Sequence, residues 1–211
     1  MNAAQLPALA AWLRERLRQP LPGIIAHEEM KAVPIGENFK IVHKENPKPG
    51  SVLILLYPNE NKICIPLILR SSYNGAHSGQ ISFPGGKSEH NESAESTAVR
   101  ETKEEIGVEP ESIELIGQLS PHFVLPSNFL VQPVVGVTFS KPQFSPDKRE
   151  VVEVIEFEVS SMFQAGSIRK DIIQVGTYVL NAPFFNSGGK KIWGATAMML
   201  NEFRILLQDW K

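Results

Sequence analysis

Acidic residues recur at fixed spacing in the middle of the chain. Gly86 is followed after five residues by Glu92, and seven further residues lead to the segment Arg100-Glu101-Thr102-Lys103-Glu104-Glu105-Ile106-Gly107-Val108. On a helix that turns by about 100° per residue, Glu105 lies about 40° to one side of Glu101 and Glu104 about 60° to the other. The spacing therefore predicts a helix over residues 92–106 that carries three carboxylates on one face.

Carboxylates that crowd onto one helix face repel one another unless a cation lies among them. Hard oxygen ligands of this kind suit Mg²⁺ or Mn²⁺. The alternative is a solvated acidic face balanced by Arg100 and Lys103, which is the usual outcome for a run of charges. The surroundings favour the metal site, because the turn Phe83-Pro84-Gly85-Gly86 precedes the helix and Gly107 is placed to end it.

The other residues of this helix indicate how it packs. Ala94 and Ala98 lie on the acidic face, where their small side chains leave it unobstructed. Val99, Thr102 and Ile106 form a separate stripe that we expect to pack against a sheet.

The whole segment resembles the Nudix box: Gly, five residues, Glu, seven residues, Arg-Glu, an apolar residue, any residue, Glu-Glu, any residue, Gly and an apolar residue. Thr102 stands where an aliphatic residue is usual, and every other fixed position agrees. The resemblance implies an α/β fold, a Nudix-type α/β/α sandwich with a mixed β-sheet. It also implies a metal-dependent enzyme that hydrolyses a pyrophosphate bond in a small-molecule nucleoside diphosphate substrate.

Divalent metal neutralises phosphate oxygens and acidifies water, and the acidic helix fits this demand. Glu101 and Glu105 are the expected metal ligands. Glu104 is either a further ligand or the base that takes a proton from the attacking water. Gly86 lets the backbone approach the metal and offer a carbonyl oxygen. The candidate catalytic residues are therefore Glu104, Glu101 and Arg100, and the candidate metal ligands are Glu101, Glu105, Glu104 and Gly86.

Two supporting contacts are expected around these residues. Arg100 can orient the carboxylates by pairing with Glu104 one turn on or by folding back to Glu92. A diphosphate substrate usually calls for more than one cation, so an acidic residue outside the helix, Glu150 or Glu153, is expected near the metal. Both could instead be exposed strand residues.

Residues upstream of the box resemble the accessory signature of the coenzyme A pyrophosphatase branch. The matching positions are Arg70, Ser71, His77, Gly79 and Phe83–Gly86, and the departures are Pro66, Ile68, Asn74 and Gly75. The resemblance implies that coenzyme A or acyl-coenzyme A is cleaved to 4′-phosphopantetheine and adenosine 3′,5′-bisphosphate, with Arg70 and His77 as substrate-binding residues. The arginine missing at Gly75 matters, because a cation there could hold the 3′-phosphate. On general grounds, Arg70 could instead be a surface residue and His77 a solvated loop residue.

Two other functions stay open. The first is hydrolysis of another nucleoside diphosphate derivative, such as a nucleotide sugar, ADP-ribose or a dinucleotide, which the departures at Ile68, Asn74 and Gly75 favour. The second is a non-catalytic ligand sensor with a Nudix fold. The intact acidic helix argues against the sensor, since a binding module does not need a full set of metal ligands.

Composition excludes some partners. The 211 residues are 42% hydrophobic with a formal net charge of −2, which suits a globular domain and argues against non-specific nucleic-acid binding. No apolar stretch approaches the roughly 20 residues of a membrane span, and charged residues interrupt the N-terminal apolar segment, unlike a secretory signal. We therefore expect a cytoplasmic protein without nucleic-acid or membrane partners, and a homodimer stays open.

The pattern along the chain predicts an N-terminal helix and lead-in over residues 1–33 and a Nudix hydrolase domain over residues 34–211. Helices are expected over 3–18, 92–106 and 195–208. Strands are expected over 51–57, 62–69, 80–83, 112–119, 130–139, 151–159, 172–180 and 192–193.

Overall fold

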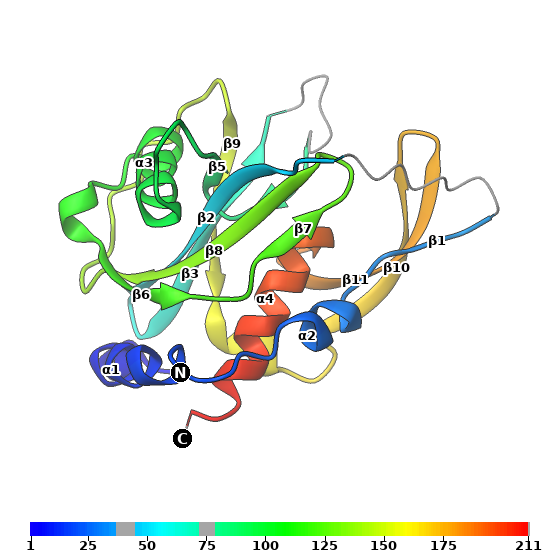
Figure 1. The fold of residues 1–211 in the computed structure, drawn as a ribbon. Coiled ribbons are helices and arrows are strands. Elements are labelled where there is room, and N and C mark those ends of the chain that lie inside the picture. Colours follow the sequence, from blue (N-terminus) through cyan, green and yellow to red (C-terminus); the bar gives the residue numbers. More distant parts are fainter. Residues whose placement is uncertain (37–44, 72–78, 211) are drawn as a thin grey trace.

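The computed structural model describes residues 1–36, 45–71 and 79–210 (Figure 1). The helices are α1 (Leu6–Arg16), α2 (Ile24–Glu29), α3 (Ala94–Ile106) and α4 (Gly194–Leu207), with short 3₁₀ turns at Ala3–Gln5, Pro110–Ser112 and Val159–Phe163. The strands are β1 (Val33–Pro34), β2 (Lys48–Asn59), β3 (Lys62–Arg70), β4 (Ile81–Ser82), β5 (Gly85–Lys87), β6 (Glu114–Gln118), β7 (His122–Val124), β8 (Phe129–Val137), β9 (Val151–Glu158), β10 (Ile168–Val175), β11 (Tyr178–Ser187) and β12 (Lys190–Trp193).

The larger sheet has eight strands and is mixed. Its main path is β4-β3-β2-β8-β6, while β5 pairs with β2, β7 with β8 and β9 with β3. The central pair β2–β8 is parallel, and the other pairings are antiparallel. The predicted mixed sheet is confirmed.

Both faces of this sheet are covered, because its central strand is apolar at consecutive positions. Leu53 and Leu55 of β2 belong to a core cluster with Ala98 and Ile106 of α3. The residue between them, Ile54, belongs to the other core cluster, which contains the buried residues of α1 and α4. Successive side chains on a strand point to opposite faces, so α3 covers one face while α1 and α4 cover the other. Figure 1 shows this α/β/α sandwich, with α3 above the sheet.

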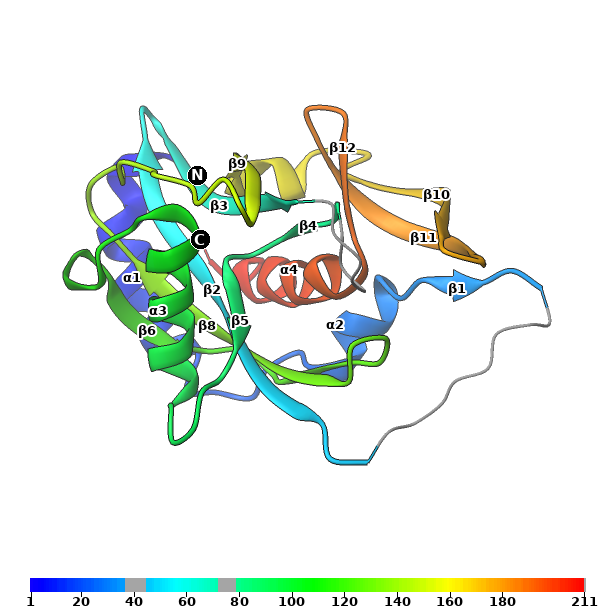
Figure 2. The same cartoon turned by 90° about the horizontal axis from the view of Figure 1, so that it is seen from above.

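A smaller sheet of four strands contains β1, β11, β10 and β12 (Figure 2). The prediction of a single strand over residues 172–180 is wrong. That segment is the tip of a hairpin in which Val175 pairs with Tyr178, and Gly176 makes the turn at a φ of 57°. Glycine adopts positive φ without steric cost, so one glycine inside an apolar run was enough to reverse the chain.

The N-terminal segment packs onto the same core as the sheet. Leu6, Leu9 and Leu13 of α1 and Met30 after α2 are buried in the cluster that also contains the α4 side chains. Helix α2 was not predicted, because its six residues are too few for a helical period to show. Within the described ranges, no helix is long and apolar enough to cross a membrane.

Candidate active site

A glycine turn brings strand β5 against helix α3. Leu53 donates its backbone N–H to the carbonyl of Pro84 at 2.9 Å, and Gly85 then pairs with Val52 as β5 begins. Gly85 has a φ of 153°, and a Cβ there would lie 2.3 Å from the carbonyl oxygen of Ser51. At Gly86 a Cβ would lie 2.5 Å from the carboxyl carbon of Glu101. Gly85 therefore requires glycine because backbone lies against it, whereas a Cβ at position 86 would displace the Glu101 carboxylate from its present place.

Helix α3 has the ends that the sequence predicted. The hydroxyl of Ser93 caps its start by accepting from the N–H of Ser96, and Gly107 ends it in the left-handed conformation at a φ of 71°. Helix α3 is rotated about its own axis so that part of its acidic face points toward the sheet, which was not expected. Ile106 is buried as predicted, but so are Ala98 and Glu105 of the acidic face, while Val99 is only partly buried.

Glu105 is the most deeply placed of the three carboxylates, with 2% of its side chain exposed. One oxygen accepts from Nη1 of Arg70 at 2.8 Å and the other from the N–H of Gly85 at 2.8 Å. Burial raises the pKa of the Glu105 carboxyl to about 7, although Arg70 and the Gly85 N–H both act to lower it.

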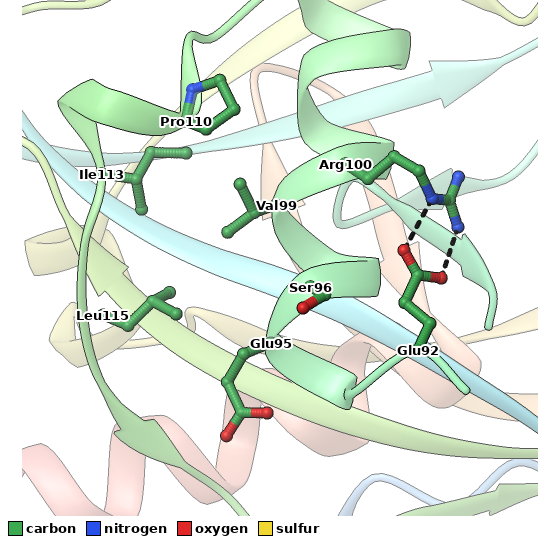
Figure 3. A pocket seen from close by; sticks show the side chains of 8 residues that line it. All are labelled: Glu92, Glu95, Ser96, Val99, Arg100, Pro110, Ile113 and Leu115. Atoms are coloured by element: carbon green, nitrogen blue, oxygen red, sulfur yellow. Dashed lines mark hydrogen bonds and ion pairs between the residues drawn. The ribbon is translucent and has the colours of Figure 1, made fainter. Parts of the chain in front are cut away.

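Arg100 holds the remaining carboxylates. Its Nε and Nη2 form a fork on the two oxygens of Glu92 at 2.8 and 3.0 Å, which Figure 3 shows as dashed lines. Its Nη1 donates to Glu101 at 2.9 Å and to Glu104 at 3.0 Å. Both contacts predicted for Arg100 are present together. The hydrogen bonds from Arg100 hold the pKa of Glu92 down at about 2, whereas burial raises the pKa of Glu101.

Of the two acidic residues outside the helix, the geometry favours Glu150. Its carboxylate lies 3.9 Å from Nη2 of Arg70, and its charge helps to raise the pKa of Glu101. Glu153 instead pairs with Lys190 at 2.9 Å. Glu150 thus joins the acidic site just before β9, while Glu153 of β9 pairs with Lys190 of β12 in the smaller sheet.

The sequence-predicted site residues fall into two groups. Arg70, Gly86 and the carboxylates of α3 meet where β3, β5 and α3 come together. His77 lies outside the described residues, as do Asn74 and Gly75 of the same signature. The direct contact between Arg70 and Glu105 was not predicted, because a residue that ends one strand and a residue on a later helix carry no pairing signal in a single sequence.

The oxygen atoms available at this site are of the chemical type that binds a divalent cation. Glu101, Glu104 and Glu105 offer hard carboxylate oxygens, and the backbone of Gly86 lies against Glu101. In the described part of the chain, no three acidic, histidine or cysteine side chains are already gathered as a metal-binding group. Arg70 contacts Glu105, and Arg100 contacts Glu101 and Glu104.

A groove on the outer flank of α3 adjoins this site, because Glu92 and Arg100 line it. Val99 faces Pro110, Ile113 and Leu115 there, as Figure 3 shows. Neither Glu101 nor Glu105 lines this groove.

The glycine turn faces a carboxylate helix on a mixed α/β/α sheet, which is the arrangement that the resemblance to the Nudix box predicted. Residues 47–174 match the family model of the NUDIX domain. The chain is 33% identical over 175 residues to the uncharacterized Nudix hydrolase NudL of Pectobacterium atrosepticum, covering 82% of this chain and 88% of that protein. It is 30% identical over 168 residues to the human mitochondrial coenzyme A diphosphatase NUDT8, covering 78% and 71% of the two chains.

Among solved structures, the Nudix hydrolase RenU of M. smegmatis superimposes with a TM-score of 0.51 at 15% identity, covering 78% of this chain and 88% of that chain. The chain belongs to the Nudix hydrolase family, and it is a pyrophosphohydrolase. Members of this family generally use divalent metal ions and act on small-molecule nucleoside diphosphate derivatives.

Proposed function

We propose that this enzyme hydrolyses the pyrophosphate bond of coenzyme A or a short acyl-coenzyme A, releasing 4′-phosphopantetheine and adenosine 3′,5′-bisphosphate. The observation that carries the proposal is where two parts of the coenzyme A pyrophosphatase signature lie: Arg70 and the glycine turn contact the acidic helix α3. The turn Phe83–Gly86 presents an N–H to Glu105, and Arg70 contacts the same carboxylate. The resemblance to coenzyme A diphosphatases of human and mouse supports the same substrate.

The residues divide the reaction among them as follows. Glu101 and Glu105 hold Mg²⁺ or Mn²⁺, with Glu104 and the Gly86 carbonyl as further donors. When bound, the cation neutralises phosphate oxygens and lowers the pKa of water. Arg100 keeps Glu101 and Glu104 in register with each other. Glu104, whose side chain is 60% exposed, is our candidate for the base that takes the proton from the attacking water.

The substrate's phosphates would enter from the side of Arg70, and the signature implies His77 as a second substrate-binding residue. Lacking an arginine at Gly75, the enzyme offers one cation fewer to the 3′-phosphate than the branch signature does. This departure, with those at Ile68 and Asn74, supports the second candidate, a nucleotide sugar, ADP-ribose or dinucleotide hydrolase. A non-catalytic sensor is the third and is opposed by the complete set of glutamates.

A substrate panel tests the proposal. Purified protein with Mg²⁺ or Mn²⁺ is assayed against coenzyme A, 3′-dephospho-coenzyme A, NADH, ADP-ribose and nucleoside triphosphates. We expect coenzyme A to give the highest kcat/KM. Equal cleavage of the 3′-dephospho form would show that the 3′-phosphate is not recognised. Strong ADP-ribose hydrolysis without coenzyme A cleavage would establish the second candidate instead.

Three further expectations remain predictions. They are a cytoplasmic location, a homodimer, and a boundary after residue 33 between the N-terminal lead-in and the Nudix domain. Gel filtration with light scattering would determine the oligomeric state.

A further inference from the structure

We propose that Arg70 is a positioning residue for the metal site. It acts by holding the Glu105 carboxylate in a fixed orientation. This inference rests on the proposed metal-dependent hydrolysis, and it assigns Arg70 a role different from the phosphate contact that the signature implies. In this positioning role, Arg70 need not touch the substrate.

The first observation is that the arginine is built into the fold. Its N–H donates to the carbonyl of Gln80 at 3.1 Å, and the N–H of the next residue, Ser71, donates to the carbonyl of Glu150 at 2.8 Å. The β3–β9 register also shifts between Leu69 and Arg70. An irregularity of this kind re-aims a side chain at the end of a strand. With 17% of its side chain exposed, Arg70 lies mostly inside the protein.

The second observation is that Glu105 is held at both oxygens. Arg70 donates to one and the Gly85 N–H to the other, each at 2.8 Å. Charge-assisted hydrogen bonds are the strongest kind in proteins, and two of them on opposite oxygens define the plane of the carboxylate. Each carboxylate oxygen has two lone pairs, so Glu105 can accept both hydrogen bonds and still offer a lone pair to a cation.

The third observation is that Arg70 reaches two acids. Its Nη2 lies 3.9 Å from Glu150 while its Nη1 contacts Glu105. The guanidinium therefore lies between the helix carboxylate, to which it is hydrogen-bonded, and the acid outside the helix, whose charge it partly offsets. A lysine could not do both, since its ammonium is a single point charge.

Partners that orient metal ligands in this way typically change metal affinity by about 10- to 100-fold when they are removed. A residue that only grips the substrate would leave metal affinity unchanged. A residue that only competes with the cation would give tighter metal binding when it is lost. Metal affinity thus separates the three roles without reference to turnover.

The experiment titrates metal-stripped protein with Mn²⁺ and follows free Mn²⁺ by electron paramagnetic resonance. The variants are Arg70→Gln, Arg70→Lys and the matched control Arg204→Gln. Arg204 is equally buried, with 16% of its side chain exposed, and pairs with Asn201 and Glu29 on the far side of the sheet. We expect the Mn²⁺ Kd to rise about 10- to 100-fold in Arg70→Gln and less in Arg70→Lys. The control should match the wild type.

Turnover provides the second measurement. At limiting Mn²⁺, Arg70→Gln should lower kcat/KM for every substrate cleaved by the same factor, and added Mn²⁺ should restore it. Unchanged Mn²⁺ affinity, with a KM raised for coenzyme A alone, would overturn the inference, and so would tighter Mn²⁺ binding. If Arg70→Gln does not fold, unchanged Mn²⁺ affinity in Arg70→Lys overturns it equally. Weaker Mn²⁺ binding in a protein that does not cleave coenzyme A would refute the proposed substrate and leave this inference standing.

Discussion

At the residue scale, three glutamates that share one helix face occupy three different environments. Glu105 is buried against Arg70, Glu101 is half-buried against Gly86, and Glu104 is largely exposed. The helical period predicted that they would lie together, and they do. It could not predict their depths, because depth depends on how far α3 is rotated onto the sheet. That rotation is set by Ala98 packing against β2.

Glu101, the less buried of the two expected metal ligands, gives the cleanest test of metal binding. Glu101→Gln keeps the shape of the side chain and removes its charge, so we expect a normal melting curve. Turnover should fall by at least about a hundred-fold, the range that loss of a catalytic acid–base or ligand group produces. Steady-state assays with saturating Mg²⁺ provide the measurement. Glu95→Gln, on the outer flank of the same helix, should retain full activity. Near wild-type turnover in Glu101→Gln would remove it from the site.

At the scale of elements, the long apolar strands, helices α1, α3 and α4 and the short strands β4 and β12 were predicted, and several other elements were not. Strands β2 and β3, with the turn between them, follow the apolar pattern, and α3 and α4 end within a few residues of their predicted limits. The hairpin β10–β11, helix α2 and strand β7 were missed. Each depends on a turn or a tertiary contact, and His122 in β7, for example, lies against His27 of α2.

The turn before α3 can be tested by adding one methyl group. In Gly85→Ala the new Cβ would collide with the β2 backbone at 2.3 and 2.6 Å, and backbone cannot move aside cheaply. Gly166→Ala is the matched control, since Gly166 also has a positive φ but has open space around it. We expect the control to lose about 1–2 kcal/mol of unfolding free energy from backbone strain alone. Gly85→Ala should lose clearly more in urea titrations. Equal losses would mean that the close approach to β2 is unimportant.

At the scale of the whole molecule, a buried polar cluster ties the N-terminal helices to α4. Glu202 of α4 accepts from the ring of His27 at 2.9 Å and from the N–H groups of Gly23 and Ser120 at 3.0 and 3.3 Å. His122 completes the cluster, 3.3 Å from His27. Nothing in the sequence connects these residues, because they come from three separated segments that meet only when the fold closes.

This cluster predicts how stability depends on pH. Burial and the neighbouring His27 lower the pKa of His122 from 6.5 to about 4. Between these values the unfolded chain binds a proton that the folded protein does not, so stability falls as the pH drops from about 6.5 to 4. The loss approaches about 3 kcal/mol, from roughly 1.4 kcal/mol per pKa unit.

Urea titrations between pH 7 and 4.5 measure this loss. His122→Gln should flatten the dependence, whereas His90→Gln, at an exposed position, should leave it as in the wild type. An equally steep loss in His122→Gln would assign the effect to other groups.

The contacts of Arg100 also fix the number of residues that can separate Glu92 from Arg100. One guanidinium grips Glu92, which precedes α3, together with Glu101 and Glu104 near its end. A single residue inserted between Glu92 and Arg100 would swing the arginine by about 100° around the helix axis. It could then no longer reach Glu92, although every side chain would still be present. The number of residues between Glu92 and Arg100 is thus constrained to seven. The identities of those seven residues can change far more easily than their number.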